Sequence, residues 1–259
     1  MVWRVWGDGR PLVLLHGASG SWTHWIRNIV PLAARFRVIV PDMPGFGESD
    51  TPPEPHTADA LADLVVASLD DVVSPPAELD IAGFSFGGII GGLVAARLGR
   101  RVRTLVLLGA GGLGLPPAPT PPLLRIQADM TPDEIRHAHR ENLRILMIAN
   151  PERIDDLAVF LQIENLRRVR FKSGGIPASD VLLRALPAIR ARITGIWGSR
   201  DAFVGPHLED RRRLLASVQR DLDFRTIDGA GHWVTYEAAD QVNAALLDIL
   251  MEGGTARHP

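Results

Sequence analysis

The sequence contains no cysteine, which excludes disulfide bonds, thiolate metal sites and cysteine nucleophiles. It also lacks an excess of charge of either sign, because 28 Lys and Arg residues nearly balance 30 Asp and Glu residues, for a formal net charge of -2. A chain with mixed charges has no long-range field that would attract a polyanion or a charged membrane surface, so we expect no nucleic-acid partner. No apolar stretch approaches the roughly 20 residues that a membrane-spanning helix needs, so we expect no membrane partner either.

The first residues lack a charged leader, a following apolar run and a small-residue cleavage site. We therefore expect no secretory signal and a cytoplasmic location. The hydrophobic share of 46% and the charged share of 22% are typical of an ordinary globular protein. With 259 residues the chain is long enough for one large core, so we predict a single domain that carries an insertion.

Short apolar runs rich in Val, Ile and Leu predict strands that are buried on both faces, as in a parallel sheet. The predicted strands are residues 12–15, 38–40, 79–82, 104–108 and 193–197, with 224–227 as a weaker sixth. Segments with helical spacing lie between them, at residues 25–34, 57–73, 86–98, 206–217 and 238–251. This alternation predicts an α/β fold with a mainly parallel central sheet and helices on both faces.

The alternation breaks after residue 108, where a glycine-rich segment (109–114) is followed by a proline-rich one (116–122). Two helical patterns follow at 132–148 and 151–171 before the strand pattern resumes. We predict that residues 112–189 form an inserted helical cap over the strand ends, and that 1–111 and 190–259 form the core. The alternative is a peripheral helical pair that does not contact the site. The tail from residue 252 to 259 is predicted to be frayed.

The strongest local signal is the Gly-x-Ser-x-Gly pattern at residues 83–87, between a predicted strand and a predicted helix. A strand that turns sharply into a helix holds its turn residue in a strained conformation and presents that side chain at the sheet edge. Ser85 is therefore the candidate nucleophile. The backbone N–H of Phe86, at the helix N-terminus, is the candidate donor to an oxyanion. The alternative is a small-residue turn that only lets helix and sheet pack.

A serine hydroxyl needs a base, and His232 lies where a base is expected, just after the last strand and just before the last helix. Its flanking glycines leave the loop free to aim the ring. His16 also follows a strand directly, and we predict that it braces its loop. The remaining histidines before residue 252 lie in the cap or near loop and helix starts.

The base needs an acidic partner, and Asp201 follows the predicted strand 193–197 through a short loop on the same edge. Asp223 and Asp228 are competitors, but Asp228 is too close to His232 in the chain for a separate-loop geometry. The loop at residues 16–20 follows the first predicted strand, and this position commonly supplies a second oxyanion N–H. Ala18 is the candidate donor.

In order and spacing, these segments and the turn at 42–47 resemble the α/β-hydrolase superfamily over about two thirds of the chain. Residues 231–233 with Glu237, and residues 201–204, resemble the meta-cleavage-product hydrolases of that superfamily. The resemblance implies hydrolysis of a carbon–carbon bond in vinylogous diketo acids, with a cap arginine that binds the substrate carboxylate. Arg167 and Arg168 are the candidates for that arginine.

The alternative for this basic segment is a solvated helix face on which Glu164 pairs with Arg168. The chain also departs from the subfamily in carrying Phe84 where many members have asparagine, and Ala18 with Ser19 where they have a longer glycine run. An acyl ester is then an equally natural substrate. We expect Trp233 and Phe84 to contact the substrate in an apolar pocket.

The sequence therefore predicts a serine hydrolase that acts on a small-molecule carbonyl substrate, as a carbon–carbon bond hydrolase, a carboxylesterase or a cofactor-free perhydrolase. No metal or other cofactor is expected, and a homo-oligomer remains open. A hypothesis from another class is a non-catalytic ligand receptor that kept the hydrolase fold. The complete set of serine, acid and histidine argues against the receptor.

Overall fold

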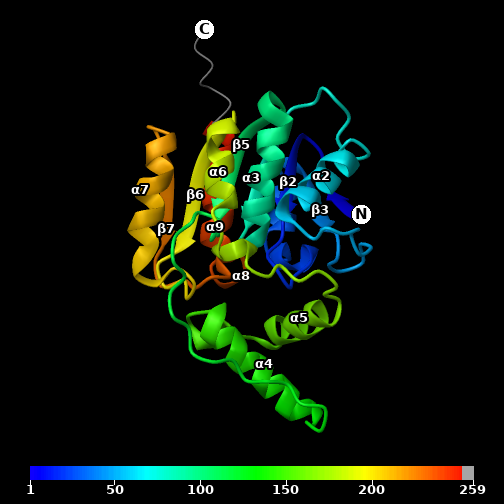
Figure 1. Ribbon diagram of the computed structural model, residues 1–259, viewed down its shortest axis with the longest axis vertical. Helices are drawn as coiled ribbons and strands as arrows, with labels where there is room; N and C mark the ends of the chain where they lie inside the picture. The colour runs from blue at the N-terminus through cyan, green and yellow to red at the C-terminus, as the bar shows by residue number, and fades with distance from the viewer. Residues whose placement is uncertain (253–259) are drawn as a thin grey trace.

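A computed structural model describes residues 1–252, so the predicted frayed tail lies almost entirely outside the described residues. The core is a seven-stranded sheet with the order β1-β3-β2-β4-β5-β6-β7 (Figure 1). Only β1 is antiparallel to its neighbour. This arrangement confirms the predicted α/β fold with a mainly parallel sheet. The strands are β1 (Val2–Trp6), β2 (Arg10–Leu15), β3 (Phe36–Asp42), β4 (Leu79–Phe84), β5 (Val102–Leu108), β6 (Arg192–Gly198) and β7 (Asp223–Ile227).

The central strands read as apolar runs because each contributes to cores on both faces of the sheet. In β2, Leu12 and Leu14 pack into one apolar cluster, whereas Val13 and Leu15 pack into the other. All four side chains are at most 2% exposed. Alternation along a strand is lost when both faces are covered, and for this reason the sequence pattern predicted these strands.

Helices cover both faces of the sheet (Figure 1). Apolar residues of α2, α3, α6 and α7 lie in one cluster, and those of α1, α8 and α9 lie in the other. The helices are α1 (Ile29–Ala33), α2 (Ala58–Leu69), α3 (Phe86–Leu98), α4 (Pro132–Leu146), α5 (Asp156–Arg167), α6 (Val181–Ala185), α7 (Leu208–Val218), α8 (Val234–Glu237) and α9 (Ala239–Glu252).

Helices α4 and α5 lie beyond the sheet, on the side of its strand ends (Figure 1). Each begins where its sequence provides a cap. Thr131 and Glu134 form a capping box at α4, and the Asp155 side chain accepts a hydrogen bond from the Ala158 N–H at α5. The second cap helix therefore begins at Asp156, later than predicted, because a short 3-10 turn starting at Pro151 comes first. The division into core and cap stays a prediction.

The last part of the inserted segment returns to the core. Leu182 of α6 is fully buried and lies so close to Gly92 of α3 that a Cβ on that glycine would be 2.2 Å from its Cδ1. The element is too short to show a helical period, and the sequence pattern therefore did not predict it. Helices α4 and α5 are the part of the segment 112–189 that extends over the strand ends.

Two differences from the predicted elements lie near the N-terminus. Strand β1 was not predicted, because it is a half-buried edge strand with no continuous apolar run. The predicted helix at 25–34 is instead a 3-10 turn (Trp22–Trp25) followed by the short α1. Between them, the buried Asn28 donates a hydrogen bond through Nδ2 to Oδ1 of Asn243 on α9, 2.8 Å away. This long-range contact is not visible in the local pattern.

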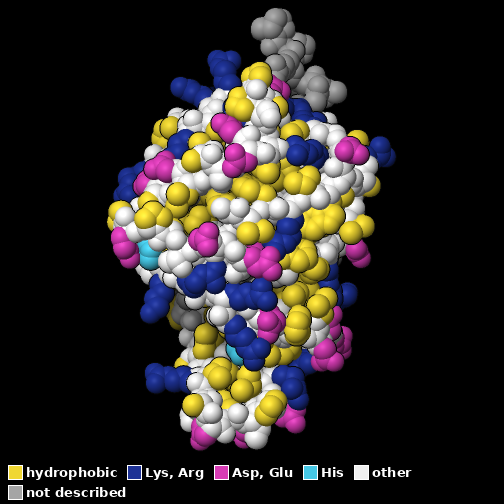
Figure 2. All heavy atoms as spheres, turned by 90° about the vertical axis from the view of Figure 1, so that its right-hand side faces the viewer, with side chains coloured by type: hydrophobic (Ala, Val, Ile, Leu, Met, Phe, Trp, Pro, Cys, Tyr) yellow, Lys and Arg dark blue, Asp and Glu magenta, His cyan; other side chains and the backbone are white. Residues whose placement is uncertain are grey.

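The surface agrees with the mixed charge of the sequence. On the face drawn in Figure 2, basic and acidic side chains are interspersed with apolar ones and form no extended field of one sign. Within residues 1–252, no helix has the length and apolar character needed to cross a membrane.

Candidate active site

Ser85 occupies a sharp turn between β4 and α3. Its backbone has φ 53° and ψ −115°, a conformation that costs a non-glycine residue about 1–3 kcal/mol. The flanking glycines make the turn possible: a Cβ on Gly83 would lie 2.4 Å from the carbonyl oxygen of Gly87, and one on Gly87 would lie 2.3 Å from that of Leu15. The Ser85 N–H donates to the Leu108 carbonyl at 2.7 Å. The turn is thus held in the strained form that exposes the hydroxyl.

Three side chains from three separate loops meet at this edge of the sheet. The Ser85 hydroxyl lies 2.9 Å from Nε2 of His232, and Nδ1 of the same ring lies 2.8 Å from Oδ2 of Asp201. Both His232 and Asp201 are buried, with 4% and 3% exposure. A carboxylate at Nδ1 keeps the proton on that nitrogen, which leaves Nε2 as the acceptor for the serine proton.

The local structure explains why Asp201, rather than its competitors, reaches the histidine. Its Oδ1 accepts a hydrogen bond from the Phe203 N–H at 2.9 Å, which leaves Oδ2 for the ring. Asp228 instead contacts the Ser199 hydroxyl at 3.1 Å, and Asp223 pairs with Arg225. The loop after β6 therefore brings Asp201, the candidate acid, to the histidine ring.

The loop after β2 lies directly against the turn. A Cβ on Gly17 would be 3.2 Å from the Cβ of Ser85, so this loop and the candidate nucleophile nearly touch. Ala18 lines the same cavity as Ser85, and Phe86 begins α3 immediately after it. Their backbone N–H groups remain the candidate oxyanion donors.

Two buried histidines hold this loop. Nδ1 of His16 donates to the Gly17 carbonyl, and its Nε2 accepts from the Met43 N–H at 2.9 Å, so the ring joins the loop to the end of β3. Burial lowers the pKa of His16 to about 4. The pKa of His24 is also lowered, first by burial and then by the neighbouring His16 and His232; its Nδ1 accepts from the Gly17 N–H. The predicted bracing role of His16 agrees with these contacts.

A cavity of about 400 Å³ opens at Ser85. Phe84 and His232 form part of its wall, and their ring centroids are 5.1 Å apart. Apolar side chains of the core and of the inserted segment form much of the rest. They include Leu115, Pro117, Leu123, Leu146, Met147, Leu166, Pro177 and Val204. The inserted segment therefore contacts the candidate site, and a peripheral helical pair is not what the structure shows.

Three predicted substrate contacts do not lie in this cavity. Trp233 is fully buried beside it, where its Nε1 donates to the His24 carbonyl. Arg167 is 68% exposed and pairs with Glu164 one turn earlier, and Arg168 is 49% exposed and approaches Glu48. The predicted pairing of Glu164 with Arg168 is therefore wrong. Both arginines lie at the end of α5, where their side chains extend into solvent.

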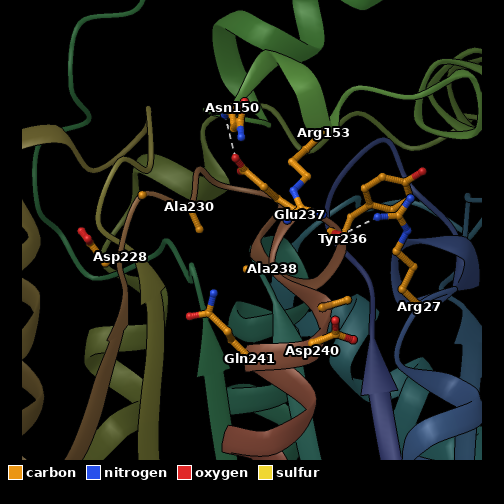
Figure 3. Close-up of a pocket in the computed structure, with 12 residues that line it drawn as sticks. Arg27, Asn150, Arg153, Asp228, Ala230, Tyr236, Glu237, Ala238, Asp240 and Gln241 are labelled. Atoms are coloured by element: carbon orange, nitrogen blue, oxygen red, sulfur yellow. Dashed lines mark hydrogen bonds between the residues drawn. The ribbon is translucent and has the colours of Figure 1, made fainter.

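One residue that the sequence reasoning left without a role supports the histidine loop from behind. The buried carboxylate of Glu237 accepts hydrogen bonds from the N–H groups of Gly231 at 2.7 Å, Asn150 at 2.7 Å and Ala149 at 3.1 Å. Figure 3 shows this carboxylate directed at Asn150. The Trp233 N–H also donates to the Met147 carbonyl. The loop that carries His232 is thus tied to the segment between α4 and α5.

A second residue without an assigned role is Arg211 of α7. Its side chain is buried, with 5% exposure, and lines the cavity at Ser85. In the sequence it stands first in a run of three arginines, and the other two are exposed at 58% and 71%. The run alone gives no signal that one member turns inward.

A strained serine turn on a mainly parallel sheet, with an aspartate and a histidine from later loops, is the arrangement typical of the α/β-hydrolase fold. The chain belongs to the alpha/beta hydrolase family, whose model matches residues 12–245. The relatives it resembles include named hydrolases.

The chain is 28% identical to a 2-hydroxy-6-oxo-6-phenylhexa-2,4-dienoate hydrolase of Burkholderia cepacia, over 95% of this chain and 90% of that one. It is 31% identical to the dihydrolipoyllysine-residue acetyltransferase component of an acetoin cleaving system of Pseudomonas putida. That match covers 93% of this chain but only 64% of the relative. Among solved structures, a meta-cleavage product hydrolase from Pseudomonas fluorescens IP01 superposes with a TM-score of 0.74 at 23% identity, over 96% and 93% of the two chains. That likeness shows the fold.

Proposed function

We propose that the chain is a serine hydrolase that attacks a carbonyl carbon through Ser85, with His232 as base and Asp201 as the partner of the base. The observation that carries this proposal is the continuous hydrogen-bonded series from the Ser85 hydroxyl through the His232 ring to Asp201, at 2.9 and 2.8 Å. Both distances lie within the reach that proton transfer requires.

In the first half of the proposed reaction, Nε2 of His232 takes the Ser85 proton while Oγ attacks the carbonyl carbon. Negative charge develops on the carbonyl oxygen, and the N–H groups of Phe86 and Ala18 are the proposed donors to it. His232 then gives its proton to the leaving group, and an acyl group stays on Ser85. In the second half, water attacks the acyl group with His232 again as base, and Ser85 is released.

The substrate is proposed to be a small carbonyl compound enclosed between the core and the helical insertion. Two substrate types fit this mechanism. A carbon–carbon substrate is suggested by the name of the Burkholderia cepacia relative, and it requires protonation of the leaving carbon. An ester needs no such step. A perhydrolase reaction uses the same three residues with peroxide in place of water.

The first experiment measures hydrolysis of 4-nitrophenyl acetate by the wild type and by Ser85→Ala. We expect the variant to lose at least about 1,000-fold in kcat, as is usual when a nucleophile is removed. Ser217→Ala is the matched control, because Ser217 is an exposed serine on α7. Equal rates in the wild type and Ser85→Ala would reject the serine mechanism and favour a ligand receptor.

The second experiment distinguishes the substrate types. It compares kcat/KM for short 4-nitrophenyl esters with kcat/KM for 2-hydroxy-6-oxo-6-phenylhexa-2,4-dienoate. A large preference for the dienoate would identify a carbon–carbon bond hydrolase, and a large preference for the esters would identify an esterase.

A further inference from the structure

The cavity at Ser85 contains one cationic side chain that the proposed mechanism does not use. Arg211 lies on the first turn of α7 and is 5% exposed. The residues that line the cavity include no Asp, Glu or Lys, so within the described chain Arg211 is its only permanently charged group. A buried guanidinium stays charged at neutral pH, because its pKa starts far above 7.

The donors of this guanidinium are mostly unused by the protein. Nη1 donates to the His207 carbonyl at 3.0 Å, whereas the buried Nε has no hydrogen-bond partner. None of the salt bridges among residues 1–252 involves Arg211. Its neighbour Asp210 contacts His207 and Arg213 and acts on Arg211 through its charge, without a salt bridge. A buried cation that no carboxylate contacts directly is costly, so an anion that entered the cavity and bound it would stabilise it.

Other arginines of the same chain show what a structural role looks like. Arg10 donates through Nε to Asp80 at 2.6 Å and through Nη2 to the Leu250 carbonyl at 2.7 Å. Arg27 pairs with Asp155 and stacks on the Tyr236 ring. Arg192 also leaves its Nε without a partner, but it does not line the cavity at Ser85. Among the arginines of residues 1–252, Arg211 alone combines an unpartnered Nε with a place in the cavity wall that contains Ser85.

The carboxylate of Asp201 lies near Arg211 but does not accept a hydrogen bond from it. Burial lowers the pKa of Arg211, and the nearby charges of Asp201 and Asp210 oppose that shift. Both oxygens of Asp201 are already occupied, however, by His232 and by the Phe203 N–H. Arg211 therefore keeps donors that no group of the described residues accepts, on a side chain that lines the cavity.

We propose that Arg211 binds an anionic group, in particular a carboxylate, of a substrate whose carbonyl carbon is attacked by Ser85. This inference rests on the proposed serine mechanism and narrows its substrates to carbonyl compounds that carry a negative charge. The planar guanidinium suits a carboxylate because it offers two parallel donors. The anionic end then lies on the side of the cavity formed by the β6–α7 loop, where Phe203 and Val204 also line the wall.

This placement corrects the expectation that came from the family resemblance. An arginine of the cap, Arg167 or Arg168, was expected to hold a substrate carboxylate. Both extend into solvent outside the cavity, whereas Arg211 comes from a core helix and lines it.

The test compares anionic and neutral esters that differ only at one carboxyl group. Mono-4-nitrophenyl succinate, glutarate and adipate carry the carboxylate on the acyl side, and 3-acetoxybenzoate carries it on the aryl side. The methyl ester of each is its neutral partner. Initial rates, corrected for spontaneous hydrolysis, give kcat/KM for the wild type, Arg211→Gln, Arg211→Lys and the control Arg212→Gln. Arg212 is the exposed neighbour on the same helix.

We expect the wild type to prefer at least one anionic ester by about tenfold or more, as a charge-assisted hydrogen bond in a cavity allows. Arg211→Gln should abolish the preference by lowering kcat/KM of the anionic ester more than that of its neutral partner, and Arg211→Lys should retain part of the preference. Arg212→Gln should behave as the wild type. No preference in the wild type for any anionic ester overturns the inference. Equal losses on both members of a pair in Arg211→Gln also overturn it, because they indicate that Arg211 only positions the Asp201 loop.

A binding measurement separates this inference from the serine mechanism. Calorimetry of the preferred half ester with Ser85→Ala, and with Ser85→Ala combined with Arg211→Gln, reports affinity without turnover. Tighter binding to the single variant supports Arg211 whether or not Ser85 is the nucleophile. If hydrolysis depends on Ser85 but the half ester binds Ser85→Ala and the double variant with equal affinity, the role of Arg211 is rejected and the serine mechanism is retained.

Discussion

Two pockets share the loop that carries His232, and they differ in how their buried polar groups are paired. The polar pocket behind the loop has a volume of about 520 Å³ and is lined by Arg27, Tyr236 and Glu237 (Figure 3). Arg27 and Tyr236 both bind Asp155 at 2.5 Å, and burial with this hydrogen bond raises the pKa of Tyr236. The smaller cavity in front contains Ser85 and Arg211.

This difference distinguishes a supporting structure from the proposed site of chemistry. Behind the loop, the carboxylate of Glu237 already has three N–H partners, so its role is to hold the chain. In front of the loop, the Ser85 hydroxyl contacts a base and the Arg211 guanidinium has unused donors. Polar groups that the protein pairs itself stabilise the fold, whereas a buried polar group left unpaired requires another explanation, which the proposed anion supplies for Arg211.

The largest expected effect on kcat distinguishes Asp201 from Asp228, two acids near the loop that carries His232. Asp201→Asn should lower kcat for 4-nitrophenyl acetate by about 1,000-fold to 10,000-fold, because an amide favours the wrong tautomer of His232. Asp228→Asn, at an exposed residue that contacts Ser199, is the matched control and should change kcat by less than about threefold. Steady-state kinetics at pH 7 measures both variants. Similar losses in the two variants would mean that Asp201 is not the specific partner.

The polar pocket should respond to mutation through stability first. Glu237→Ala leaves three N–H groups without their acceptor, and we expect the free energy of unfolding to fall by about 3 kcal/mol. Glu237→Gln keeps one acceptor oxygen and should lose less. Urea unfolding measures both, with the exposed Asp240→Ala as control. An unchanged midpoint in Glu237→Ala would show that the carboxylate does not hold the loop.

The buried histidines beside the front cavity should make the fold sensitive to acid. The unfolded chain protonates His16 below pH 6.5, whereas the folded protein protonates it only near pH 4, so stability falls as pH decreases from 6.5 to 4. His16→Gln lacks this titration and should lose less stability between pH 7 and pH 4.5 in urea unfolding. An identical pH dependence in wild type and variant would contradict this account.

The smallest effect is expected at the exposed arginine that the family resemblance singled out. Arg167→Gln removes one surface ion pair with Glu164, which is worth about 0–1 kcal/mol. Its kcat/KM for anionic and neutral esters should stay within about twofold of the wild type. A loss of kcat/KM in Arg167→Gln for anionic esters only would indicate that Arg167, and not Arg211, binds the carboxylate. The contrast between the two pockets would then no longer hold.

The three residues that meet at the sheet edge were all predictable for one reason. Each of Ser85, Asp201 and His232 directly follows a strand or its short loop, and parallel strands place their carboxyl ends at one edge. The strands themselves were visible because burial on both faces produces apolar runs. Strand β1, buried less and only at the edge, produced no such signal.

Arg211 and Glu237 were not predictable because their roles depend on long-range packing. Arg211 is one of three consecutive arginines, and only the phase of α7 against the loop after β6 decides which one turns inward. Glu237 acts through backbone groups that are 87 and 88 positions away in the chain. Trp233 shows the reverse error, since its place next to His232 in the sequence suggested a substrate contact, but its side chain points into the core.

The central claim is that Ser85 is a nucleophile activated by His232, and covalent labelling tests it most directly. A fluorophosphonate probe reacts with activated serines, so intact-mass analysis followed by peptide mapping should show one phosphonyl group per chain, on Ser85. Labelling should disappear in Ser85→Ala and become much slower in Asp201→Asn. A wild-type protein that stays unlabelled, or one labelled at another residue, would contradict the account.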